Sequence, residues 1–118
     1  MPLHPNVYKR TLLFLKNIKM ENVFKYGKFI KRIFATSSPI IRKKLLTSSN
    51  SDIIKAIAEI ILNIYHLNFT VSKQGIKQLK KVRPIISKII NKKTSPNTRQ
   101  QLLIKHSEAF VPIKEVFK

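Results

Sequence analysis

The sequence predicts an all-α protein, a small single-domain bundle of about five helices with a looser N-terminal segment and C-terminal tail. Two observations predict this class. The 118 residues include only two Gly and show no alternating apolar and polar run with hairpin turn signals. Apolar residues instead recur at i, i+3, i+4 and i+7 over most of the chain. We expect a cationic amphipathic segment over 1–36, a helical basic domain over 37–110 and a tail over 111–118.

The first elements are expected to be amphipathic helices. A loose apolar stripe predicts a weakly bounded helix from about Asn6 to Met20. A stronger stripe predicts a cationic helix from Val23 to Phe34. Ser38 and Pro39 form a good N-cap and first-turn pair, and they predict a short helix that ends near residues 47–50. Its cations are expected to point outward; they are Arg42, Lys43 and Lys44.

The best helical pattern of the chain follows Ser51 and Asp52, which we interpret as the start signal. Its seven apolar positions keep almost perfect helical spacing; they are Ile53, Ile54, Ile57, Ile60, Ile61, Ile64 and Leu67. Burial of such side chains contributes roughly 1.5–3 kcal/mol each, so we expect this helix to form the centre of the core. Residues 68–71 are expected to form a loop.

The last third of the chain contains two further cap signals. Ser72 is expected to cap a basic helix, and Pro84 should kink or split it because proline removes a helix hydrogen bond. Another short helix is expected to begin at Ser95 and Pro96. The tail from Phe110 onward contains Pro112. Two alternatives stay open for it: it packs on the core, or it waits for a partner.

The charge is extreme, with 24 Lys and Arg against 5 Asp and Glu and a formal net charge of +19. Residues 1–49 hold 11 cations and one acid, and residues 70–93 hold eight cations and no acid. Such an excess repels itself in a compact chain, so it indicates a polyanionic partner, either a nucleic acid or an anionic membrane surface. A solvated surface usually mixes both signs.

The residues needed for catalysis or metal binding do not occur in the required patterns. The chain has no Cys, its three His have no metal-ligand spacing, and its five acids lie in different expected elements. Neither Gly belongs to a phosphate-binding loop or a nucleophile elbow. We therefore expect no enzyme activity, no catalytic residues, no metal site and no cofactor. No apolar run approaches the ~18–20 residues of a membrane-spanning helix.

The sequence predicts a nucleic-acid-binding protein that contacts phosphates without sequence preference. Lys outnumbers Arg, whereas base reading favours Arg. Double-stranded DNA is the favoured partner, and RNA stays an alternative. The candidate binding residues are Arg42, Lys43, Lys44, Lys73, Lys77, Lys80, Lys81, Arg83, Lys88, Lys92 and Lys93.

Two other interpretations stay open. Residues 1–36 are an amphipathic segment that suits an anionic membrane surface, with Phe24, Phe29 and Phe34 inserted. In a structural protein, the helix over 53–67 and the tail would instead dock on a capsid, a ribonucleoprotein or a second copy of the chain.

Several short motifs resemble one family. They are RKKLL at 42–46, IKAI at 54–57, LN at 62–63, Ser72, LKK at 79–81, NKKTS at 91–95 and LLIKH at 102–106. Their order over residues 28–110 is similar to that of the small basic proteins of Polinton (Maverick) elements and adintoviruses, which are compared with adenovirus core peptides. The chain lacks that family's Cys in the helix matching 53–67 and has Ser107-Glu108-Ala109-Phe110 in place of a Gly-Gly-Phe. The resemblance implies a core protein that condenses double-stranded DNA in a virion or the host nucleus.

Overall fold

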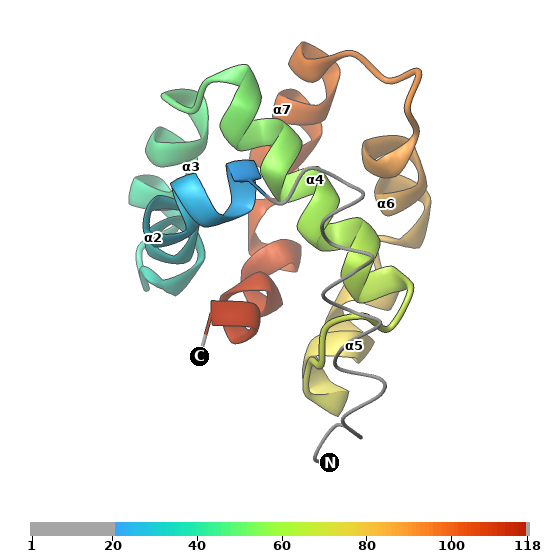
Figure 1. The fold of residues 1–118 in the computed structure, drawn as a ribbon. Coiled ribbons are helices and arrows are strands. Elements are labelled where there is room, and N and C mark those ends of the chain that lie inside the picture. Colours follow the sequence, from blue (N-terminus) through green and yellow to red (C-terminus); the bar gives the residue numbers. More distant parts are fainter. Residues whose placement is uncertain (1–20, 118) are drawn as a thin grey trace.

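The computed structural model describes residues 21–117 (Figure 1). The helix expected over residues 6–20 lies outside the described residues. Within them all regular secondary structure is helical, which confirms the all-α class. Between residues 21 and 117 there are seven helices in place of about five; they are α2 (Glu21–Ala35), α3 (Pro39–Thr47), α4 (Ser51–Tyr65), α5 (Lys73–Lys80), α6 (Arg83–Ile90), α7 (Pro96–Lys105) and the 3-10 helix η1 (Ser107–Phe117).

Helix α4 runs through the middle of the molecule, and α2, α6 and α7 pack against it (Figure 1). Six of the seven predicted apolar positions, Ile53 to Ile64, are buried. The N-cap is Asn50, one residue before the expected start signal, and its Oδ1 accepts a hydrogen bond from the Ile53 amide at 2.9 Å. The apolar stripe of α4 is therefore covered by helices of the same chain.

The seventh position, Leu67, is not part of the core. Helix α4 ends at Tyr65, and the side chain of Leu67 in the following turn is 79% exposed. The expectation that Leu67 is buried was wrong because the helical register stops two residues before it.

The predicted split at Pro84 is confirmed. Helix α5 ends at Lys80, and Arg83 starts α6 with the proline in its first turn, where a missing amide costs no helix hydrogen bond. The cap predictions hold for the flanking serines. Ser38, Ser72 and Ser95 each accept a hydrogen bond from the backbone amide three residues later.

The C-terminal tail packs on the core, which is the first of the two alternatives left open for it. Phe110 and Ile113 are fully buried, and η1 lies against α2 and α5. The Glu115 carboxylate accepts hydrogen bonds from the amide and the hydroxyl of Ser72, at 2.9 and 3.1 Å. This contact fixes η1 to the N-terminus of α5.

Helix α2 uses most of its apolar face inside the protein. Ile30, Ile33 and Phe34 are fully buried, and Phe29 is partly buried against the core. Of the three aromatic residues expected to insert in a membrane, only Phe24 is largely exposed, at 76%. Phe34 is thus unavailable to lipid. None of the helices between residues 21 and 117 has the length and apolar content needed to span a bilayer.

Candidate nucleic-acid interface

Ten of the eleven predicted binding residues are exposed, and one is not. The exception is Arg42, whose side chain is 3% exposed. The expectation that Arg42 points outward with its two neighbours was wrong. Lys43 and Lys44 do point to solvent.

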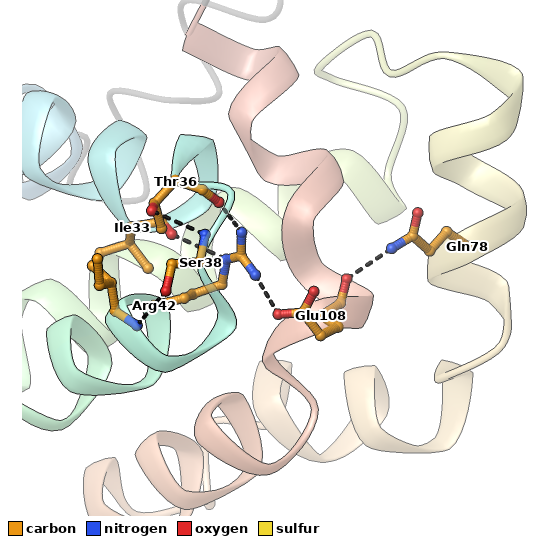
Figure 2. A network of polar contacts seen from close by, with 7 residues as sticks. Ile33, Thr36, Ser38, Arg42, Gln78 and Glu108 are labelled. Atoms are coloured by element: carbon orange, nitrogen blue, oxygen red, sulfur yellow. Dashed lines mark hydrogen bonds and ion pairs between the residues drawn. The ribbon is translucent and has the colours of Figure 1, made fainter.

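Figure 2 shows what holds the Arg42 guanidinium. Its Nε donates to the carbonyl oxygen of Ile33 at 3.1 Å, and its Nη2 donates to the carbonyl oxygen of Thr36. Its Nη1 forms an ion pair with Glu108, whose backbone carbonyl accepts a hydrogen bond from Gln78 at 2.7 Å. Arg42 thus satisfies carbonyls at the end of α2 and links α2, α3 and η1. It is a structural residue.

Helix α5 presents three of the predicted cations on one face. Lys73, Lys77 and Lys80 are exposed and spaced four and three residues apart, so they lie one above the other on the helix. The opposite face, with Gly75 and Leu79, is buried. The burial of that face therefore directs the three ammonium groups toward solvent.

The cationic surface continues through α6. Lys81, Arg83 and Lys88 are exposed, as are Lys92 and Lys93 in the turn that follows α6. Asn91 shapes this turn, because its Oδ1 accepts from the Lys93 amide at 2.9 Å and its carbonyl accepts from Arg99 Nη2 at 2.8 Å. Eight exposed cations thus lie on consecutive elements of the chain, and we call this set the α5–α6 surface: Lys73, Lys77, Lys80, Lys81, Arg83, Lys88, Lys92 and Lys93.

The two lysines of α3 are not part of this surface. Figure 1 places α3 near the N-terminal end of α4 and α5 near its C-terminal end. Sequence reasoning also left four exposed cations of α2 out of the site; they are Lys25, Lys28, Lys31 and Arg32. The amphipathic spacing of α2 indicates that these cations are exposed, but in the sequence we interpreted that spacing as a sign of membrane binding.

Acidic side chains do little to neutralise the α5–α6 surface. No Asp or Glu occurs between residues 60 and 107. Two acids of η1 come near α5: Glu115 adds one negative charge beside Ser72, from which it accepts hydrogen bonds, and Glu108 forms its ion pair with Arg42. A phosphate backbone would therefore meet cations that the chain itself leaves largely uncompensated.

An apolar hollow opens at the edge of this surface, and sequence reasoning missed it. Its volume is about 450 Å³, and it lies between the end of α4, α5 and α6. Lys80 and Arg83 line it together with the exposed side chains of Tyr65 and Leu67. The helical spacing placed Leu67 among the expected core positions, so an exposed apolar residue beside a hollow was not expected there.

In the described part of the chain, His, Asp and Glu side chains form no group of three that would hold a metal ion. Comparison with protein families, with curated proteins and with solved structures finds no significant match. Function is therefore inferred from the surface itself.

Proposed function

We propose that this protein binds nucleic acid through phosphate contacts, without sequence preference, and that double-stranded DNA is its main partner. The observation that carries the proposal is the α5–α6 surface, with eight exposed cations and no acid in its own segment. Lysine ammonium groups act as point charges, so they suit a phosphate backbone better than the paired acceptors of a base edge.

The helices supply the positioning. The lysines of α5 project from a short helix whose other face is fixed in the core, so little backbone ordering is needed on binding. Lys92 and Lys93 extend the surface in a turn stabilised by Asn91. Arg42 is excluded from the binding set because its guanidinium is engaged inside the protein.

The proposed biological setting follows the family resemblance, a core protein that condenses DNA in a virion or an element particle. Charge alone fits structured RNA as well, because both polymers present phosphates. Parallel titration of duplex DNA and structured RNA separates the two partners.

The salt dependence of affinity tests the proposal. If about 6–8 cations contact phosphate, the logarithm of the association constant should fall with the logarithm of salt concentration at a slope near −5 to −7. A slope shallower than about −2, or no binding at low salt, would refute phosphate-based binding.

A charge-matched pair of variants locates the surface. Replacing Lys77, Lys80, Lys81 and Lys88 with Gln should flatten the slope by about 3 to 4 while helicity stays unchanged. The control carries the same charge change elsewhere; it replaces Lys28, Lys31, Lys43 and Lys44 with Gln. Equal loss of slope in both variants would mean that net charge, and not the α5–α6 surface, determines binding.

A further inference from the structure

The turn that follows α4 has a leucine, Leu67, at a position where glycine is usual. The Leu67 amide donates to the Ile64 carbonyl at 3.0 Å, and the Asn68 amide donates to the Asn63 carbonyl at 2.8 Å. These two hydrogen bonds form a Schellman motif, in which the residue at the position of Leu67 adopts the left-handed conformation. Leu67 has a φ of 61°, and this is a position that glycine usually occupies because a side chain is strained there.

Leu67 is also poorly placed for the stability of the fold. Its side chain is 79% exposed, and the neighbouring Tyr65 is 46% exposed. The left-handed backbone costs folding free energy at this residue, and the exposed side chain contributes little burial to offset that cost. Backbone strain of this kind clusters at functional sites, and exposed apolar patches mark binding sites.

Both residues border the apolar hollow. Its lining includes Ile61, Ile64, Tyr65, Leu67, Lys80 and Arg83. The hollow therefore combines an aliphatic lining, one aromatic ring and two cations. A ligand that fits must present an apolar face together with a negative charge beside it.

We propose that this hollow receives one unstacked nucleobase, with Tyr65 and Leu67 against the base and with Lys80 and Arg83 on the adjoining phosphates. The inference rests on the proposed function and names the form of nucleic acid that the surface prefers. Lys80 and Arg83 belong to both the α5–α6 surface and the hollow, so a strand bound along the surface passes the mouth of the hollow.

The chemistry of a base suits the site. The faces of a base are apolar and stack on aromatic and aliphatic side chains, whereas its polar edge stays solvated at the open mouth. An acidic amphipathic helix is the competing occupant, because its apolar side chains would enter the same hollow. The continuity with a phosphate-binding surface favours the nucleotide.

The test compares three DNA probes: a perfect duplex, the same duplex with one unpaired thymidine, and the same duplex with one unpaired abasic site. All three carry nearly the same charge, and the abasic probe bends without offering a base. We expect the parent protein to bind the thymidine bulge about 5- to 100-fold more tightly than the abasic bulge. Tighter binding must disappear in the variant Leu67→Gly.

Leu67→Gly is informative because it should not damage the fold. Glycine relieves the left-handed strain, and little buried surface is lost, so the melting temperature should rise or stay unchanged. Its affinity and salt slope for the perfect duplex should match the parent. Phe24→Ala, which removes an exposed apolar side chain far along the chain on α2, is the control and should keep the preference for the bulged thymidine.

The outcomes separate the two proposals. Absence of binding to all three probes at low salt overturns the proposed function. Binding to all three with equal affinity, or a preference that survives in Leu67→Gly, overturns the nucleobase site alone. Binding of an acidic Leu- and Glu-based helical peptide that is lost in Leu67→Gly, without any base preference in the parent, reassigns the hollow to a protein partner.

Discussion

The variant Arg42→Ala should unfold the protein far more readily than its neighbour Lys43→Ala. Arg42 donates to two main-chain carbonyls at the end of α2, and the Ile33 acceptor is buried. A hydrogen bond from a charged donor contributes about 1.5–3 kcal/mol, and a carbonyl left unsatisfied in the interior adds to the loss. The Glu108 carboxylate is 60% exposed, so solvent screening reduces the ion pair to about 0–1 kcal/mol.

We therefore expect Arg42→Ala to lower the free energy of unfolding by about 2–4 kcal/mol, against a typical total of about 5–15 kcal/mol for a domain. With a urea m-value near 1.5 kcal/mol/M, a loss of 3 kcal/mol moves the unfolding midpoint by about 2 M. Circular dichroism during urea titration measures this shift. Lys43→Ala, one residue away on the same helix and exposed, should change the midpoint little.

The opposite pattern would refute the structural role of Arg42. If Arg42→Ala unfolds at the urea concentration of Lys43→Ala and its DNA salt slope falls by about one, then the guanidinium binds phosphate. Arg42→Lys adds a further check. A lysine keeps the charge but cannot reach three separate acceptors with a planar fork, so it should recover only part of the stability.

Three further perturbations probe how the helices are held together. Gly75→Ala should destabilise the fold by about 1–3 kcal/mol, because the added Cβ would lie 2.4 Å from Val71 Cγ1 and 2.7 Å from Glu115 Oε2. Gly27→Ala is the matched control: its added Cβ has its nearest contact at 3.4 Å, so the variant should raise the melting temperature. Ile57→Ala and Ile61→Ala should each lower the free energy of unfolding, measured in urea, by about 2–4 kcal/mol. A loss no larger than that caused by a substitution at an exposed residue would argue against α4 as the centre of the core. Gln100→Ala should cost about 1–2 kcal/mol, because its Nε2 donates to the Leu46, Thr47 and Ser49 carbonyls, whereas the exposed Gln101→Ala should be nearly neutral.

Local chemistry made much of the fold predictable from sequence. The hydroxyls of Ser38, Ser72 and Ser95 cap helices through the amide three residues later, and Pro84 splits a helix through its own missing amide. Each of these signals acts within one helical turn, so no knowledge of the tertiary structure is needed. The spacing of isoleucines over 53–64 likewise identified the buried face of α4.

The direction in which individual side chains point could not be predicted from the sequence and became clear only from the tertiary structure. Arg42 and Lys43 are adjacent cations on one helix, and only the approach of Glu108, 66 residues later, together with the end of α2 makes an interior place for one of them. A long guanidinium side chain can be buried when enough acceptors surround it, and helical spacing does not reveal those acceptors.

Sequence by itself thus determined the helical class, most helix ends and the concentration of cations over 73–93. The tertiary structure decided which cations face solvent, that the tail closes the core, and that Leu67 leaves the core at the turn after α4. The reason is physical. Helix periodicity and capping depend on residues within a few positions, whereas burial depends on which distant segments pack against them.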